Sequence, residues 1–214
     1  MKVAVGPVAV EMDDRDRICW HIKQGNGFEP QSLLAWSQIA NHGTVIDIGA
    51  YTGLFSIAAV MLGAVSVLAI EPLPNNLDLL YANMRANGVE FEVIVGAASD
   101  HVGEAVLNYN PKVNYTTGGS LNPMKEWYSK LPTDVITIDS LNLEHVSAIK
   151  IDVEGHEDKV IAGAMHTILR DKPKILVEVL TPEARARVEA LLSGYIVAEV
   201  LDRRNVLMLP TEGD

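Results

Sequence analysis

The chain has 214 residues, of which 17 are Lys or Arg and 28 are Asp or Glu, so its formal net charge is −11; it holds one cysteine, and 48% of its residues are apolar. This composition fits one α/β domain or two small ones, and the apolar content excludes a disordered chain. A single cysteine excludes a disulfide scaffold. Lys and Arg form no cluster, so this acidic chain is expected to bind neither nucleic acid nor an anionic membrane surface.

One long uncharged stretch could be mistaken for a membrane span. Between Asp47 and Glu71, residues 48–70 carry no charge, and a helix of that length could cross a bilayer. Residues 48–53 are turn-like, however, and Gly63 divides the remainder into two pieces that are too short. The chain opens without a basic segment followed by an apolar one, so no signal peptide is expected, and a lone cysteine is typical of a reducing cytoplasm.

The remaining pattern predicts strands that alternate with helices. Residues 1–30 are expected to form an N-terminal extension, and residues 31–214 one domain. Short β-branched runs indicate buried strands, and apolar positions at helical spacing between a proline and a glycine indicate helices. In chain order, the expected elements are a strand at 44–48, a helix at 54–62, a strand at 66–70, a helix from Pro74 to Gly88, strands at 91–95, 103–109, 135–138 and 148–153, one helix through 160–168, a strand at 174–180, a helix from Pro182 that stops at Gly194, and strands at 195–200 and 205–210.

This alternation predicts an α/β fold in which a mostly parallel sheet carries helices on both faces. In such sheets the ligand binds at the carboxyl ends of the strands. Polar residues fall at or just beyond five predicted strand ends, namely Asp47, Glu71, Ser99, Asp152 and Glu178. We therefore expect the functional site at this edge of the sheet.

The first motif, residues 47–53, runs from a strand through a glycine loop into a helix with the spacing D-x-G-x-x-x-G. Glycines let the backbone approach a ligand closely. The middle glycine of the dinucleotide pattern G-x-G-x-x-G is missing, which disfavours a pyrophosphate. Asp47 would suit a cationic ligand such as S-adenosylmethionine, and Glu71 could accept hydrogen bonds from ribose hydroxyls. For Asp47 alone, the alternative is a capping or turn aspartate.

A further motif holds Asp152, Glu154, His156 and Glu157 directly after a predicted strand. Three carboxylates and an imidazole within six positions are costly to group unless they serve a cation, a proton transfer or a hydrogen-bond network. For Glu157 alone, the alternative is an acidic residue in the first turn of a helix, where the helix dipole stabilises it.

These motifs, with Glu71-Pro72 between them, resemble in order and spacing the FkbM family of S-adenosylmethionine-dependent methyltransferases, from about Phe28 to Glu178. The resemblance implies a class I methyltransferase fold, which is Rossmann-like, with a sheet of seven strands in the order 3-2-1-4-5-7-6 and an antiparallel seventh strand. It also implies S-adenosyl-L-methionine as the cofactor and O-methylation, often of sugars or secondary metabolites, as the activity.

The same resemblance implies positions for the cofactor. Asp47, Gly49 and Gly53 would line its methionine end, Glu71 the ribose, Ala98 and Ser99 the adenine, and Asp152 the floor beside the methyl group. Ala50, Tyr51 and Pro72 belong to the same loops and are expected to contribute to cofactor binding. Tyr51-Thr52 stands where many family members have Asn-Ile, so the family's side-chain contacts do not carry over to these two positions.

Methyl transfer requires an aligned acceptor oxygen and removal of its proton. We hypothesise that Asp152 or His156 is the base and that Glu154 orients the acceptor, a small molecule or glycan whose identity the sequence does not reveal. A divalent ion between Asp152 and Glu178 is the competing mechanism. Two other functions stay open, a non-catalytic module that binds the cofactor and an NAD-dependent oxidoreductase.

The segment 110–134 matches no expected element, although it contains Tyr115, Trp127 and Tyr128. A long irregular segment in a compact domain usually serves function. It is expected to form a lid over the cofactor or part of the acceptor pocket, and the alternative is a surface excursion with a small aromatic cluster of its own.

Overall fold

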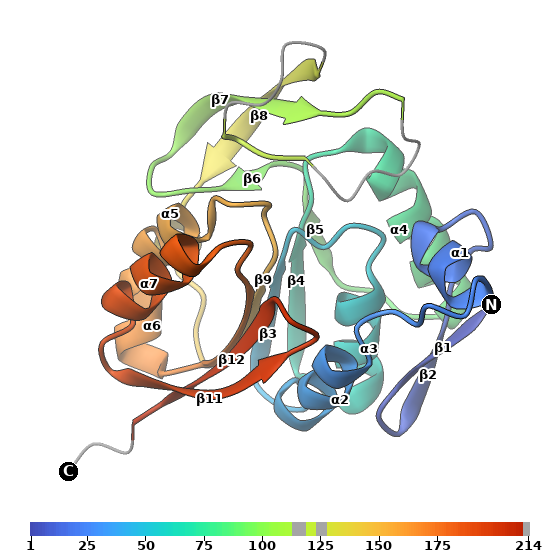
Figure 1. Cartoon of the computed structure of the whole chain (residues 1–214), viewed down its shortest axis with the longest axis horizontal. Helices are drawn as coiled ribbons and strands as arrows, with labels where there is room; N and C mark the ends of the chain where they lie inside the picture. Colours follow the sequence, from blue (N-terminus) through green and yellow to red (C-terminus); the bar gives the residue numbers. More distant parts are fainter. Residues whose placement is uncertain (113–118, 123–127, 212–214) are drawn as a thin grey trace.

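A computed structural model describes residues 1–112, 119–122 and 128–211. A seven-stranded sheet lies at its centre between two layers of helices, and a smaller sheet lies across one end (Figure 1). From edge to edge, the large sheet consists of β11 (Tyr195–Leu201), β12 (Asn205–Pro210), β10 (Lys174–Glu178), β9 (Val146–Ile151), β3 (Thr44–Ile48), β4 (Ser66–Ile70) and β5 (Glu92–Ile94).

The pairing in this sheet agrees with the order that the family resemblance implies. Strands β5, β4, β3, β9 and β10 are parallel to one another, and β12 runs antiparallel to both β10 and β11. Numbered along the chain within this sheet, the order is 3-2-1-4-5-7-6, and the seventh strand is the antiparallel one. The predicted fold class is therefore confirmed.

Helices cover both faces of the sheet (Figure 1). They are α2 (Pro30–Ile39), α3 (Leu54–Leu62) and α4 (Pro74–Asn87) on one face, and α5 (Glu157–Ala162), α6 (Met165–Asp171) and α7 (Pro182–Leu191) on the other. Alternation along the strands separates two cores, so that Val45 of β3 belongs to the same core as Trp36 while its neighbour Ile46 belongs to the core that contains Val160. Within the described residues, every helix is too short or too polar to cross a bilayer, and the uncharged residues 48–70 comprise the last residue of β3, the glycine loop, α3 and β4.

Residues 1–30 pack against the helices that cover one face of this sheet. They contain a hairpin of β1 (Lys2–Val5) and β2 (Val8–Glu11), followed by α1 (Arg17–Lys23). Val10 and Ile18 are buried in the same core as Trp36. The backbone N–H of Asp13 donates to Asn83 Oδ1 at 2.8 Å, which fastens the segment to α4. The extension thus shares a core with the sheet, and the domain boundary after it stays a prediction.

The smaller sheet consists of β6 (Ala97–Ala98), β8 (Ser129–Ile136) and β7 (Gly103–Tyr109), in that order. The expectation of a strand only at 135–138 is wrong, because residues 129–135 pair in antiparallel register with the whole of β7. The last six residues of the segment 110–134, which was expected to be irregular, therefore belong to a strand. Residues 113–118 and 123–127, with Tyr115 and Trp127, lie outside the described residues.

The helix expected through 160–168 is in fact two, α5 and α6, which are separated at Gly163. A Cβ atom on Gly163 would lie 2.0 Å from the carbonyl oxygen of Ser99, so this glycine permits a close approach between two loops. Among the strands, β9 begins and ends earlier than predicted, and Asp152 therefore follows the strand instead of continuing it.

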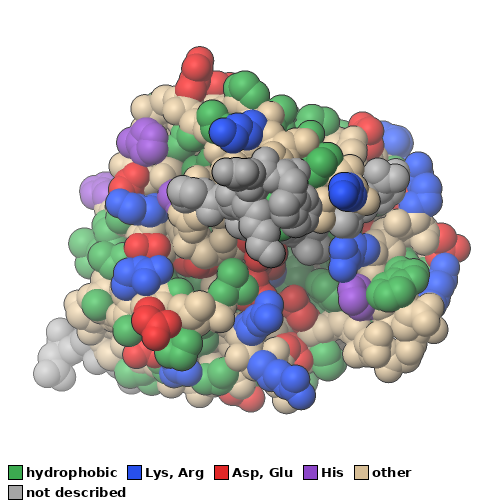
Figure 2. All heavy atoms as spheres, turned by 45° about the horizontal axis from the view of Figure 1, so that its top comes forward, with side chains coloured by type: hydrophobic (Ala, Val, Ile, Leu, Met, Phe, Trp, Pro, Cys, Tyr) green, Lys and Arg blue, Asp and Glu red, His purple; other side chains and the backbone are tan. Residues whose placement is uncertain are grey.

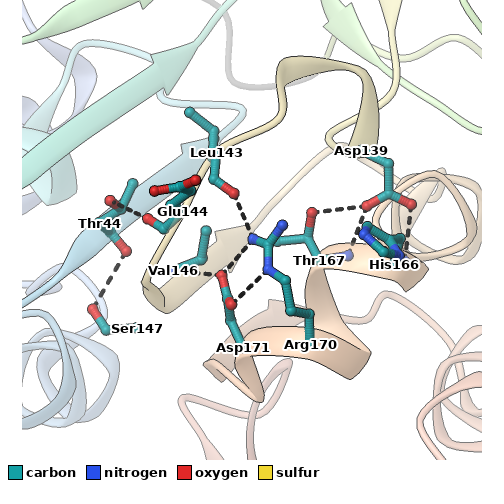
Figure 3. Close-up of polar contacts among 10 residues, drawn as sticks. All are labelled: Thr44, Asp139, Leu143, Glu144, Val146, Ser147, His166, Thr167, Arg170 and Asp171. Carbon is teal, nitrogen blue, oxygen red and sulfur yellow. Dashed lines mark hydrogen bonds and ion pairs between the residues drawn. The ribbon is translucent and has the colours of Figure 1, made fainter.

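Polar contacts fix the end of the sheet that lies away from the carboxyl ends of its parallel strands (Figure 3). Asp139, in the short 3-10 helix η1 (Asp139–Leu141), accepts hydrogen bonds from the N–H groups of His166 and Thr167 at 2.9 and 2.8 Å and so caps α6. At the other end of α6, Asp171 accepts the N–H of Val146 at 2.8 Å. These contacts anchor the start of β9, the strand that leads into the site.

Candidate functional site

A cavity of about 420 Å³ lies at the carboxyl ends of β3, β4, β9 and β10. With the top of Figure 1 turned forward, acidic and basic side chains are interspersed over the surface (Figure 2). Most of the residues predicted from the sequence line the cavity, namely Asp47, Gly49, Ala50, Tyr51, Glu71, Pro72, Ala98, Asp152, Glu154, His156 and Glu178. Gly53 and Ser99 are not among the lining residues.

The glycine loop joins three strand ends. The N–H groups of Gly49 and Ala50 both donate to the carbonyl of Ile70, at 2.9 and 3.0 Å, and the N–H of Asp152 donates to Ile48 at 3.0 Å. Gly49 has φ +78°, and a Cβ atom there would lie 1.9 Å from the Asp152 carbonyl oxygen. Only glycine therefore allows the two loops to meet as closely as they do.

Gly53 lies just behind the residues that line the cavity, at the N-terminus of α3. It has φ +86° at the start of α3, and a Cβ atom there would lie 3.1 Å from Leu80 Cγ. Its conformation turns the chain from the loop into the helix.

Glu71 holds the loops after β3 and β4 together. Its carboxylate accepts hydrogen bonds from the N–H groups of Tyr51 and Leu73, both at 2.9 Å, and from Asn76 Nδ2 at 3.0 Å. Burial raises the pKa of Glu71 to about 7, in spite of these donors. The side chain thus lines the cavity as a fixed acceptor, and its contact with a ribose stays a prediction.

Asp47 and Lys150 are neighbours in the register of β3 and β9, and both face α3. Asp47 is 1% exposed and accepts a hydrogen bond from Ser56 Oγ at 2.5 Å. Lys150 is 3% exposed, lies 4.5 Å from the centre of the Phe55 ring, and places its Nζ 3.0 Å from Asp152 Oδ2. The cavity floor therefore contains a buried cation between two carboxylates.

Burial governs the protonation of this floor. It raises the pKa of Asp47, and the positive charge of Lys150 opposes that rise. Burial alone would lower the pKa of Lys150, but the charges of Asp152, Asp47 and Glu29 outweigh it and raise the pKa instead. Lys150 is therefore an ammonium ion at neutral pH.

A second group of carboxylates gathers where β9 and β10 end. One oxygen from each of Asp152, Glu154 and Glu178 lies within 4.8 Å of the others. Burial, followed by the charges of Asp152 and Glu157, raises the pKa of Glu154 to about 7. Burial and the charge of Asp152 also raise the pKa of Glu178. Such a group can share a proton, receive one from a substrate or hold a cation.

His156 connects the wall of the cavity to the described part of the segment 110–134. Its Nε2 lies 2.9 Å from Ser99 Oγ, and its Nδ1 lies 3.3 Å from Asn122 Oδ1. Burial lowers the pKa of His156. Asn122 Nδ2 also donates to the carbonyl of Gly155 at 2.7 Å, and Ser120 Oγ to that of Glu154 at 2.9 Å.

Part of the segment 110–134 therefore does reach the cavity, where Gly119 and Leu121 line it. Its role as a lid stays a prediction. Glu157, by contrast, does not line the cavity, and its Oε1 accepts the N–H of Gly155 at 2.8 Å. This favours the structural alternative for Glu157, at the first turn of α5.

Sequence reasoning missed several lining residues. Lys150 could have been found, because it is the one charged residue of β9, a strand that is buried on both faces. Glu29 lines the cavity with φ +40°, and burial raises its pKa to about 7. Neither Glu29 nor Arg17 carries a local signal, because the fold brings them to the cavity from the N-terminal segment.

The fold is that of class I methyltransferases. The methyltransferase FkbM from Methylobacillus flagellatus KT aligns with a TM-score of 0.57 and 18% identity, over 82% of this chain and 48% of that chain. The Pyrococcus abyssi tRNA (uracil-54, C5)-methyltransferase, solved in complex with S-adenosyl-L-homocysteine, aligns with a TM-score of 0.51 and 15% identity, over 98% of this chain and 43% of that chain. At such identities the similarity is one of fold.

The sequence itself assigns the family. The family model described as the methyltransferase FkbM domain matches residues 47–201, so the chain belongs to this family, as predicted. A curated relative, the ribosomal protein L11 methyltransferase of Geobacillus thermodenitrificans (strain NG80-2), is 34% identical over 86 residues, which are 37% of this chain and 28% of that protein. The chain thus spans less than half the length of this relative and of the FkbM structure.

Proposed function

We propose that this protein transfers a methyl group from S-adenosyl-L-methionine to a hydroxyl of a sugar or another small metabolite. The observation that carries the proposal is one cavity that combines the glycine loop of an FkbM domain with carboxylates at four strand ends. The complex of the structurally similar Pyrococcus abyssi enzyme with S-adenosyl-L-homocysteine supports the choice of cofactor.

The cavity offers a complementary surface for each part of the cofactor. Ala97, Ala98 and Leu107 form an apolar wall that suits an adenine ring. Glu71 can accept hydrogen bonds from ribose hydroxyls through its remaining lone pairs. Asp47 keeps its Oδ1 without a hydrogen-bond partner in the described part of the chain, and a buried acceptor of this kind suits the cofactor's amino group.

The cofactor supplies an electrophilic methyl carbon on a sulfonium, and the protein has to align the acceptor and take its proton. Glu154 has a pKa of about 7, a value suited to a base at neutral pH, and Asp152 lies within the same group of carboxylates. His156 can act as the base only if it leaves Ser99 or Asn122, since both ring nitrogens have partners. We therefore favour the carboxylate group over His156.

The first test is binding, measured by calorimetry with S-adenosylhomocysteine and with NAD, followed by a screen of metabolite and glycan extracts with methyl-labelled cofactor. We expect S-adenosylhomocysteine to bind, NAD not to bind, and label to enter a small acceptor. NAD binding alone would favour the oxidoreductase alternative. Cofactor binding without labelling of any extract would favour the non-catalytic module.

The competing mechanism with a divalent ion can be tested in the same assay. Lys150 already neutralises Asp152 at 3.0 Å, which reduces the need for a second cation between Asp152 and Glu178. We expect turnover to be unchanged after treatment with EDTA and dialysis. A loss of activity that Mg²⁺ restores would instead assign the three carboxylates to a metal.

A further inference from the structure

The described residues that line the cavity include three long cationic side chains, from Arg17, Lys150 and Arg204. Lys150 is bound to Asp152. Arg204 precedes β12 and acts electrostatically on Glu154, on the side of the cavity formed by the ends of β9 and β10. Of the three, Arg17 alone lies on the opposite side, at the start of α1, where its charge influences the pKa of the Tyr51 phenol.

The fold holds Arg17 beside the glycine loop. Asp16 caps α1 by accepting the N–H of Ile18 at 2.8 Å, and the side chain of Ile18 is 2% exposed in the core. Burial raises the pKa of the partly buried Tyr51 phenol and Arg17 opposes that rise, so Arg17 lies beside Tyr51, which belongs to the loop that follows β3. The position of this residue is thus fixed by three neighbours.

The guanidinium of Arg17 forms neither a hydrogen bond nor an ion pair with any residue that the structure describes. A cation that faces a cavity without a partner suits an anionic group of a ligand. His21 and Asn26 also line this side of the cavity, but neither offers the fixed charge and the paired donors of a guanidinium. Arg17 is therefore the group on this side best suited to bind one.

We propose that Arg17 binds the carboxylate of the methionine part of the cofactor. This inference rests on the proposed function, in which Glu71 and the apolar wall near Ala98 take the adenosine. The methionine part then extends over Gly49 and Tyr51, toward α1 and away from Arg204. A guanidinium can bind a carboxylate through two parallel hydrogen bonds, which fixes the orientation of the chain that carries the methyl group.

The proposal gives residues 1–30 a function. Arg17 lies outside residues 47–201, which the family model matches. The N-terminal segment would thus complete a cofactor site whose other parts belong to the FkbM domain.

The test compares two ligands that differ at the carboxylate, S-adenosylmethionine and its decarboxylated form, which keeps the sulfonium and the amino group. For Arg17→Met we expect calorimetry to give a Kd for S-adenosylmethionine that is about 10- to 100-fold higher, the cost of losing a hydrogen-bonded ion pair. The Kd for the decarboxylated form should stay within about twofold, because that ligand lacks the contact. Arg17→Lys should recover part of the loss, since it keeps the charge but not the two parallel bonds.

The matched control is Arg204→Met, which removes a cation from the same cavity and should weaken both ligands equally or not at all. The inference is overturned if Arg17→Met weakens both ligands by the same factor, if it weakens neither, or if the selective loss belongs to Arg204→Met. Thermal unfolding of each variant excludes a general loss of structure. If the unaltered protein binds neither ligand, the proposed function itself fails.

Discussion

Replacement of Lys150 by methionine is expected to lower the free energy of unfolding by about 3–5 kcal/mol at neutral pH, the usual cost of removing one partner from a buried ion pair. The ammonium group is 3% exposed, lies 3.0 Å from Asp152 and acts on Asp47 and Glu29. Methionine fills the same volume beside Phe55 but leaves these carboxylates without a countercharge. Urea unfolding followed by tryptophan fluorescence measures the difference.

The loss should depend on pH in a definite direction. The pKa of Glu29, about 7, and that of Asp47 are raised above their unfolded values by burial, and Lys150 opposes both rises. A raised carboxyl pKa favours the folded state at low pH, and this advantage is lost as the pH rises through the folded value. Without Lys150 that decline steepens, so the variant should be much closer to the original protein at pH 5 than at pH 8.

Lys159→Met is the matched control, because Lys159 forms its 2.8 Å ion pair with Asp100 at the surface. An exposed pair of this kind contributes little, so the control should unfold almost as the original protein does at both pH values. If Lys150→Met were equally harmless at pH 8, or if its effect did not change with pH, the countercharge role of Lys150 would be wrong.

Local sequence signals were sufficient for the centre of the fold. The strand 44–48 and the helix 54–62 have the predicted bounds, because glycines follow both elements and apolar residues fill them. Failures occurred where distant contacts decide. Residues 129–134 alternate between half-buried and exposed positions and are mostly polar, and they form a strand only because β7 pairs with them. The break between α5 and α6 depends on the approach of Ser99 to Gly163.

The same distinction applies to the site. Asp47, Glu71 and Asp152 could be identified because each ends or follows an apolar strand, and parallel strands bring such ends together. Arg17 and Glu29 come from the N-terminal segment, and only the packing of α1 and α2 brings them to the cavity. A single sequence contains no local pattern that relates a charge in one segment to a loop in another.

Gly49→Ala is expected to abolish cofactor binding and to lower the free energy of unfolding by about 4 kcal/mol or more, a size reserved for substitutions that force the backbone apart. The added Cβ would lie 1.9 Å from the Asp152 carbonyl oxygen, where only backbone can yield. Because the Asp152 N–H is bonded to Ile48 at 3.0 Å, a shift of either loop separates the ends of β3 and β9. The floor made by Asp47, Lys150 and Asp152 would then open.

Gly25→Ala separates this clash from the strain of the backbone conformation alone. Gly25 has the same φ as Gly49, +78°, but a Cβ atom there would meet nothing within 4 Å. It should therefore cost only about 1–2 kcal/mol, the penalty of a left-handed residue, and leave the Kd for S-adenosylhomocysteine unchanged. Equal losses in the two variants, measured by urea unfolding and calorimetry, would mean that φ and not the contact with Asp152 explains the glycine. A selective loss at Gly49 would mean that the site depends on the close approach of the backbones after β3 and β9, which leaves no room for a side chain at this position.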